Sequence, residues 1–265
     1  MKKRKRWKSL RRVVILKLKE GIVLKTIKYQ DSSKIVYILT EDGLISALLK
    51  NCLNQKSKNY SYSKELMMIG FDLTESKKNT FDIMTSGKVI NSYINIQNTY
   101  EKLINAVEII SLCYEYSSFI EDNKLLFSLT KTILENLNNN TFIDQDNYLF
   151  YTYIFKFKLL YLLGVGLNIN KCDECGNEEI VYFDFESGSC KCVKHAKNKF
   201  DRNLLEVIRI LYLGKIELYN EEIFSSFKDF QLQIEKFINN YYDRFLQLNK
   251  KNLKIFEKLH SVKNE

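Results

Sequence analysis

Proline is absent from the chain of 265 residues, which is instead rich in lysine, asparagine, isoleucine and tyrosine. This composition is typical of a protein encoded by an AT-rich genome. A high lysine content alone is therefore weak support for nucleic-acid binding. The positions of the lysines matter more than their number.

Long apolar stretches are also absent. The most apolar segment, residues 148–163, is interrupted by Lys156 and Lys158, so it falls short of the roughly 20 residues that a membrane-spanning helix needs. The sequence shows no secretory signal pattern. We therefore expect a soluble intracellular protein with no membrane partner, in which cysteines stay reduced.

Common catalytic signatures are missing as well. The sequence has no phosphate-binding loop, no dinucleotide-binding glycine pattern, no nucleophile elbow and no paired carboxylates. We expect no enzymatic activity. A zinc nuclease or deaminase is the weakest alternative, with Glu174 or Glu178 as its acid or base. A deaminase would also need an H-x-E pattern beside its cysteine pair, which is absent.

One short stretch does specify a chemistry. Two residues separate Cys172 from Cys175, and after sixteen more residues Cys192 and His195 repeat this spacing. Each pair is typical of a tight turn that directs two donors at one ion, and thiolate with imidazole favours Zn²⁺. Four protein donors leave no open position for water, so we predict a structural zinc ion.

Cys190 is a fifth possible donor that could replace a member of the second pair. The set with two equal spacings is preferred, and Gly176 and Gly188 flank it where the backbone must curl. A chance cluster of free thiols is the alternative, and a disulfide is less favoured in a reducing compartment. We expect buried, unreactive thiols at Cys52 and Cys113 and a surface position for His260.

The positive charge is concentrated at the start of the chain. The net charge is +9, yet residues 1–19 contain ten basic residues and no acid, and the remainder holds 31 basic and 32 acidic residues. We treat residues 1–19 as a basic N-terminal extension. It is a tail that binds phosphates, a membrane-surface tether, or the product of an upstream start codon.

Residues 20–96 have the β-branched and aromatic content of short strands. Five antiparallel strands are predicted, with a tight turn at residues 41–43, a loop at 51–63 and a bulge or bend at Gly87. The predicted strands are 21–29, 34–40, 44–50, 64–73 and 80–94. They predict a small closed barrel, with the OB-fold as the leading candidate and an SH3-like barrel as the alternative.

Residues 97–265 follow a helical period. Asp122 is a predicted N-cap, Asp144 or Asp146 is another, and Gly164 is a predicted helix end. The predicted helices are 98–120, 124–137, one ending at Gly164, 203–212, 226–248 and a frayed segment 250–265. The zinc knuckle, residues 171–200, interrupts them. The predicted fold class is α+β: an N-terminal five-stranded OB-fold barrel, then an α-helical domain with an inserted zinc finger.

This order of parts resembles the RecO family of bacterial recombination mediators. The likeness covers residues 20 to about 250. One part of it is in the opening strands, at residues 20–40, Gly43 and 47–50. The other is in the helix and zinc-finger section, at residues 155–164, Cys172-x-x-Cys175-Gly176, 183–188 and Cys192. Family members carry cysteine where this chain has His195, and a non-ligand residue where it has Cys190. They begin near residue 20, so residues 1–17 are an extension that favours the upstream start.

The resemblance implies a cytoplasmic, nucleoid-associated protein of DNA repair and homologous recombination. Such mediators bind single- and double-stranded DNA, anneal complementary strands and work with RecR and RecF. They bind the acidic, hydrophobic C-terminal tail of single-strand-binding protein and help load recombinase on DNA coated by it.

An OB barrel can hold a strand with lysines on its phosphates and aromatic rings under its bases. Tyr29 and Tyr37 are either stacking faces or barrel core. The candidate DNA-binding lysines are Lys25, Lys28, Lys34, Lys50, Lys56 and Lys58. Members of the family have a basic turn after the third strand, and in this chain that turn is reduced to Lys50, Lys56 and Lys58. The alternative function is a zinc-stabilised protein–protein adaptor that does not bind DNA directly.

Overall fold

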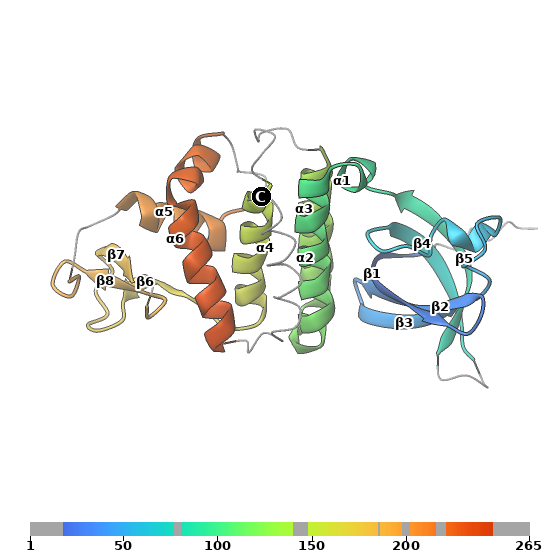
Figure 1. Ribbon diagram of the computed structural model, residues 1–265. Helices are drawn as coiled ribbons and strands as arrows, with labels where there is room; N and C mark the ends of the chain where they lie inside the picture. Colours follow the sequence, from blue (N-terminus) through green and yellow to red (C-terminus); the bar gives the residue numbers. More distant parts are fainter. Residues whose placement is uncertain are drawn as a thin grey trace, which may run out of the picture.

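The computed structural model describes residues 18–76, 81–139, 148–184, 186–197, 202–215 and 221–245. The predicted extension before Leu18, the segment 250–265 with His260, and the predicted caps Asp144 and Asp146 lie outside the described residues. Three parts lie in a row: a barrel, a group of helices and a small sheet (Figure 1). None of the described helices combines the length and the apolar character needed to cross a membrane.

The first part is a closed barrel whose strands follow the order β1-β2-β3-β5-β4. Its strands are β1 (Lys19–Tyr29), β2 (Ser33–Thr40), β3 (Gly43–Leu49), β4 (Met68–Thr74) and β5 (Asp82–Asn91). All neighbours pair antiparallel except β3 and β5, which are parallel. The prediction of five antiparallel strands was wrong for this pair. The predicted OB-type barrel is confirmed.

The barrel interior is packed with apolar side chains such as Val36, Ile38 and Phe71. The connection between β3 and β4 adds the ring of Tyr62 to this core. A Cβ on Gly87 would lie 2.7 Å from that ring, so glycine is needed there to make room for it. The register shifts between β4 and β5 fall elsewhere, at Met68/Ile69 and Asp72/Leu73. Of the predicted bulge or bend at Gly87, the bulge is therefore wrong, and the glycine serves a close approach to the Tyr62 ring.

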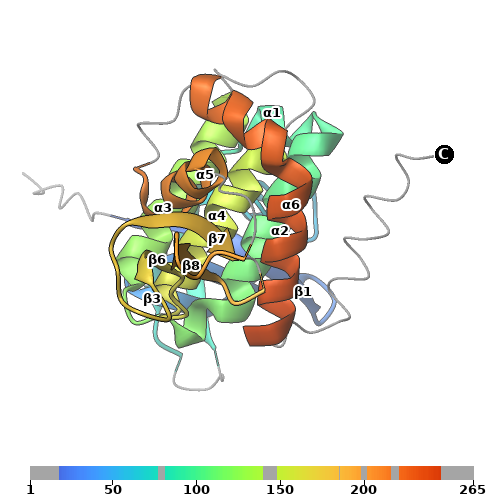
Figure 2. The same cartoon turned by 90° about the vertical axis from the view of Figure 1, so that its left-hand side faces the viewer.

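The second part is helical, and Figure 2 shows its helices running side by side behind the small sheet. Asp122 accepts the Leu125 N–H at 2.9 Å, and Gly164 ends α4 with φ +69°, as predicted. The short α1 was not predicted, and α6 begins at Glu221 rather than at 226. The helices are α1 (Ile94–Gln97), α2 (Tyr100–Tyr116), α3 (Asn123–Asn139), α4 (Leu149–Leu162), α5 (Arg202–Leu213) and α6 (Glu221–Phe245).

The barrel and the helices share one hydrophobic cluster. Ile22, Leu24 and Leu39 on the outer face of β1 and β2 belong to the same cluster as the helix residues. Helices α2 and α3 pack against β1, β2 and β3. The face of β2 and β3 that OB-folds commonly use for ligands is therefore covered by the protein's own helices.

Candidate metal centre and nucleic-acid interface

The third part is a three-stranded sheet that holds the predicted zinc ligands. It consists of β6 (Asn168–Cys172), β7 (Ile180–Asp184) and β8 (Ser189–Cys192), in the order β6-β8-β7. Since β6 and β8 are parallel neighbours, the cysteines at their ends lie at one edge of the sheet. The two pairs, far apart in sequence, meet there.

Each pair sits on a tight turn. The carbonyl oxygen of Cys172 accepts the Gly176 N–H at 2.8 Å, and that of Cys192 accepts the N–H groups of His195 and Ala196 at 3.0 and 2.9 Å. Gly176 has φ +73°, a left-handed conformation that favours glycine. The two equal spacings thus form two similar turns, as the sequence predicted.

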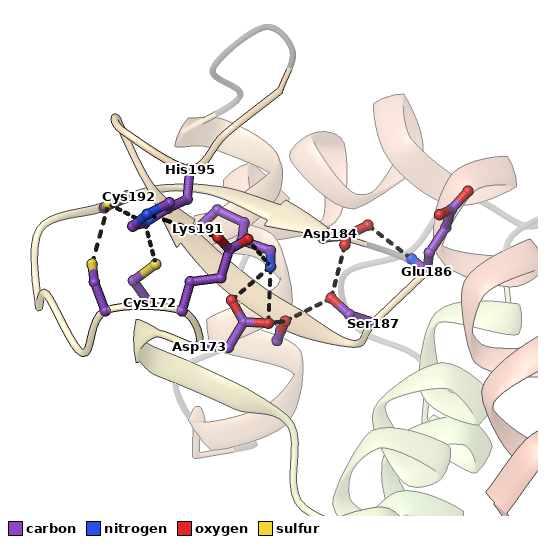
Figure 3. A network of polar contacts seen from close by, with 11 residues as sticks. Cys172, Asp173, Asp184, Glu186, Ser187, Lys191, Cys192 and His195 are labelled. Carbon is purple, nitrogen blue, oxygen red and sulfur yellow. Dashed lines mark hydrogen bonds and ion pairs between the residues drawn. The ribbon is translucent and has the colours of Figure 1, made fainter.

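The four donor atoms of Cys172, Cys175, Cys192 and His195 lie within 4.8 Å of one another (Figure 3). The Sγ atoms of Cys175 and Cys192 are 3.7 Å apart. Nδ1 of His195 lies 3.5 Å from Cys172 Sγ and 3.4 Å from Cys192 Sγ. A tetrahedral Zn²⁺ with ordinary bond lengths has sulfur–sulfur edges of about 3.8 Å and sulfur–nitrogen edges of about 3.6 Å. The donors fit such an ion.

The electrostatics favour charged sulfur at two positions. Burial raises the pKa of the Cys172 thiol, but hydrogen bonds with the backbone of Cys192, Cys175 and Glu174 and with His195 outweigh it and lower the pKa to about 6. The pKa of Cys192 is also lowered, because hydrogen bonds with backbone and side chains outweigh its burial. A thiolate is the form that binds a metal, so the site is prepared for a cation.

Cys190 lies apart from this group. It is fully buried in the large hydrophobic cluster, where burial raises the pKa of its thiol to about 12. Cys113 is equally buried with its pKa raised to about 12, and the pKa of buried Cys52 is raised too. These three thiols are packing residues, as expected for Cys52 and Cys113.

Acidic and basic side chains surround the metal centre. Lys191 Nζ lies 2.7 Å from Asp173 Oδ1 and 2.9 Å from Glu174 Oε1, and these contacts raise its pKa. Ser189 Oγ donates to Asp173 Oδ2 at 2.6 Å. The sequence had marked Glu174 only as the acid or base of a zinc enzyme. The pairing of Glu174 with Lys191 could not be seen in the sequence, because it depends on β6 lying beside β8.

The sheet is attached to α6. The ring of Phe183 meets that of Phe237 edge-on at a centroid distance of 5.2 Å. Gly188 has φ +65°, and a Cβ there would lie 2.6 Å from the Tyr241 ring. Arg244 donates to the carbonyl oxygen of Glu186 at 3.1 Å. An ion bound by the four donors would therefore also support the packing of α6.

The six candidate DNA-binding lysines do not form one surface. Lys25 Nζ lies 4.3 Å above the ring of Tyr114 on α2, between barrel and helices. Lys34 Nζ donates to the Ser63 carbonyl oxygen at 2.8 Å and is half-buried. The other four are exposed at the end of the barrel that the β3–β4 connection covers: Lys28, Lys50, Lys56 and Lys58.

The connection between β3 and β4 folds back onto this end. Asn59 of the short helix η1 (Lys58–Tyr60) donates to the Lys50 carbonyl oxygen at 2.7 Å. Lys64 Nζ lies 4.9 Å from the centre of the Tyr60 ring. Sequence reasoning missed this pair, because a polar loop has no periodicity to mark it. Of the predicted stacking residues, Tyr29 is exposed, whereas Tyr37 packs against Tyr114.

A separate apolar groove of about 310 Å³ lies on the helices. Leu125, Tyr161 and Leu213 in its wall are about half exposed. Lys158 also lines it and donates to the Gly214 carbonyl oxygen. The groove is lined by Leu125, Leu129, Lys158, Tyr161, Leu162, Tyr212 and Leu213.

Comparisons with known proteins agree with this architecture. Residues 15–93 match the family model described as recombination protein O N terminal, and residues 97–254 match recombination protein O C terminal. A protein of Listeria monocytogenes serotype 4b named DNA repair protein RecO is 26% identical over 254 residues, covering 92% of this chain and 95% of the relative.

A second relative of the same name comes from Caldicellulosiruptor bescii. It is 28% identical over 195 residues, which cover 72% of this chain and 76% of the relative. The two family models together span both the barrel and the helical part with its knuckle. The chain therefore belongs to the RecO family of DNA repair proteins.

Proposed function

We propose that this protein is a recombination mediator that binds single-stranded DNA at the lysine-rich end of its barrel. It anneals complementary strands and helps load recombinase on DNA coated by single-strand-binding protein. The observation that carries this proposal is the cluster of exposed lysines Lys28, Lys50, Lys56 and Lys58 around one barrel end. Asp31 and Glu65 are the acidic residues of the same segments, 28–34 and 50–67.

The covered face explains why the end of the barrel is used. Helices α2 and α3 occupy the outer side of β1, β2 and β3. A DNA strand therefore cannot lie along the barrel face that other OB-folds use to bind ligands. The exposed lysines provide phosphate contacts without sequence preference. Tyr60 beside Lys64 provides an aromatic ring on which a base can stack.

The test is the affinity for a labelled oligothymidine, measured by fluorescence anisotropy at several salt concentrations. We expect the combined change Lys50→Glu, Lys56→Glu and Lys58→Glu to weaken binding at least tenfold at low salt. It should also reduce the slope of log affinity against log salt by about two, since each phosphate contact contributes about 0.7.

The matched control changes three exposed lysines on the other side of the molecule, Lys171, Lys228 and Lys236, to Glu. They lie on the small sheet and on α6, away from the barrel (Figure 1). The net charge change is the same, so affinity should stay close to that of the unchanged protein. Equal affinity of both triple variants would refute the barrel-end site. Absence of DNA binding by a chain that begins at Leu18 and is otherwise unchanged would favour the adaptor function.

We also propose that the metal centre holds Zn²⁺ in a structural role. Three sulfurs and one imidazole nitrogen complete a four-coordinate shell, which is typical of a structural site without bound water. No catalytic step is part of this proposal. A chelator should lower the melting temperature of the purified protein by several degrees. Unchanged stability together with no zinc by elemental analysis would overturn it.

The apolar groove on the helices is the proposed site for the tail of single-strand-binding protein. An acidic segment with a hydrophobic end matches an apolar groove that has Lys158 in its lining. Two further exposed lysines are close in sequence to the lining. Lys124 precedes the lining residue Leu125, and Lys215 follows the lining residue Leu213 by two positions. Contacts with RecR and RecF, and action on nucleoid DNA in the cytoplasm, complete the proposal on the strength of the family.

A labelled peptide of that tail tests the groove. Leu125→Ser and Tyr161→Ser change half-exposed side chains, so they should weaken peptide binding severalfold while the melting temperature stays nearly constant. Leu232→Ser on α6 is the control, since Leu232 is 81% exposed and lies outside the groove. Peptide affinity that does not respond to Leu125→Ser or Tyr161→Ser would place the tail elsewhere.

A further inference from the structure

The two ring nitrogens of His195 face different partners. Nδ1 lies 3.5 Å from Cys172 Sγ and 3.4 Å from Cys192 Sγ. Nε2 points away from the sulfurs and lies 3.7 Å from Glu174 Oε2. A neutral imidazole carries its proton on the nitrogen that does not bind the metal. With Nδ1 among the sulfurs, the proton belongs on Nε2, where a carboxylate is the nearest charged partner.

Glu174 is itself held from the other side. Its Oε1 lies 2.9 Å from Lys191 Nζ, and Lys191 also contacts Asp173 Oδ1 at 2.7 Å. The side chain of Lys191 is only 14% exposed. The cation is therefore fixed by two carboxylates, and Glu174 has one oxygen on Lys191 and the other towards the imidazole.

We propose that Glu174 is a positioning residue of the metal centre. It keeps His195 in the tautomer that presents Nδ1 to the ion, and Lys191 keeps Glu174 in place. This proposal rests on the proposed zinc site. It concerns a feature of this chain's own ligand set, in which an imidazole stands at the fourth ligand position. Partners of this kind orient metal-bound histidines and raise their basicity.

The contribution of Glu174 to metal affinity should depend on which residue stands at position 195. A fourth cysteine at position 195 would have no ring to orient and no second nitrogen to accept a carboxylate. Glu174 should therefore matter for metal affinity when residue 195 is histidine and should not matter when it is cysteine. A merely structural role of Glu174 in the turn between Cys172 and Cys175 would matter in both cases.

The experiment measures Zn²⁺ affinity of the full chain by competition with a chromophoric chelator. Glu174→Ala should weaken binding by on the order of tenfold or more, the usual effect of removing such a partner. Glu174→Gln should weaken it less, because the amide oxygen keeps a polar acceptor on the Nε2 side of the ring. Glu178→Ala, which removes an exposed carboxylate from the same hairpin, should leave the affinity unchanged.

The same change is then made in a His195→Cys protein, where Glu174→Ala should have no effect on Zn²⁺ affinity. An equal loss in both backgrounds would overturn the proposal, and so would an unchanged affinity of Glu174→Ala in the protein with histidine. Failure of the unchanged chain to bind zinc would instead overturn the metal centre itself. Circular dichroism of the same samples identifies a variant that does not fold, in which case Glu174→Gln decides.

A second readout reports the tautomer directly. The chain has two histidines, so imidazole nitrogen signals of the zinc-loaded protein are simple to assign. We expect one ring with a metal-bound Nδ1 and a protonated Nε2. A ring bound through Nε2 would contradict the proposal whatever the affinities are.

Discussion

The ring of Tyr37 on β2 meets the ring of Tyr114 on α2 edge-on, with centroids 5.2 Å apart and planes at 80°. Lys25 on β1 places its Nζ 4.3 Å from the same Tyr114 ring. Tyr37 and Lys25 are direct neighbours across the strand pair. A lysine predicted to bind DNA, and a tyrosine that the sequence left open as a stacking face or barrel core, thus hold the barrel against the helices.

Replacing Tyr114 with alanine should therefore affect stability and not DNA binding. The change removes an edge-on aromatic contact and a cation–π contact, and we expect a loss of about 2 kcal/mol in the free energy of unfolding. Urea denaturation measures the loss, and anisotropy with oligothymidine should show an unchanged affinity at temperatures where the variant is folded. A large loss of affinity in the folded variant would mean that single-stranded DNA binds at the barrel face next to α2.

Replacing Tyr60 with alanine should have the opposite effect. Tyr60 is half-buried in the connection between β3 and β4, beside Lys64, and its ring belongs to neither hydrophobic core cluster. We expect affinity for single-stranded DNA to fall by about 1–3 kcal/mol, the usual contribution of one base stacked on an aromatic ring. Tyr60→Phe keeps the ring and serves as the control, with nearly unchanged affinity. A loss in both variants would argue against stacking.

The choice between Cys190 and Cys192 as ligand can be tested by single substitutions. Cys192→Ser should abolish stoichiometric zinc, because it removes one of the four clustered donors. Cys190→Ser should retain zinc but lower stability by about 1–3 kcal/mol, since it places a hydroxyl in an apolar site. Elemental analysis and thermal unfolding measure both effects. Zinc lost from the Cys190 variant and retained by the Cys192 variant would reverse the assignment.

A nearly buried ion pair links the helices of the second part. Lys156 Nζ on α4 lies 2.5 Å from Glu108 Oε1 on α2, with side chains only 11% and 12% exposed. Lys156→Met alone should cost about 3 kcal/mol of unfolding free energy, because it leaves a carboxylate unpaired. The double change Lys156→Met and Glu108→Met should recover most of this loss. A double variant as unstable as the single one would show that packing, not the unpaired charge, is responsible.

The sequence predicted those features that depend on local spacing. Two residues between donors in each pair were enough to find the four side chains that the structure brings together, and the strand and helix patterns placed most elements. The parallel pairing of β3 with β5 was not predictable in the same way, since it depends on how the whole barrel closes. The alternation of residues along a strand predicts which side chains share a face, but it does not predict which other element packs on that face.

The candidate DNA residues show the same limit. Lys25 and Tyr37 lie on an outer strand face, and only the docking of α2 reveals that this face is covered. Lys34 is engaged by the carbonyl oxygen of Ser63 from a loop about thirty residues later in the chain. Such contacts join segments that are far apart in the sequence, and the helix and strand periodicities do not predict which distant segments meet. The positions of Lys50, Lys56 and Lys58 in an exposed loop were the more predictable part.

In the proposed function the folded body, and not the basic extension, provides the DNA-binding surface. This is tested most directly by the rate at which complementary oligonucleotides anneal, compared between the full chain and a chain beginning at Leu18. Removing residues 1–17 removes nine of the basic residues, so annealing should slow and depend less steeply on salt, because fewer phosphate contacts are possible, but it should remain well above the protein-free rate. It should then fall to the protein-free rate when Lys50, Lys56 and Lys58 are changed to Glu. Annealing that disappears on removal of residues 1–17 alone would mean that the basic extension, and not the folded body, provides the DNA-binding surface.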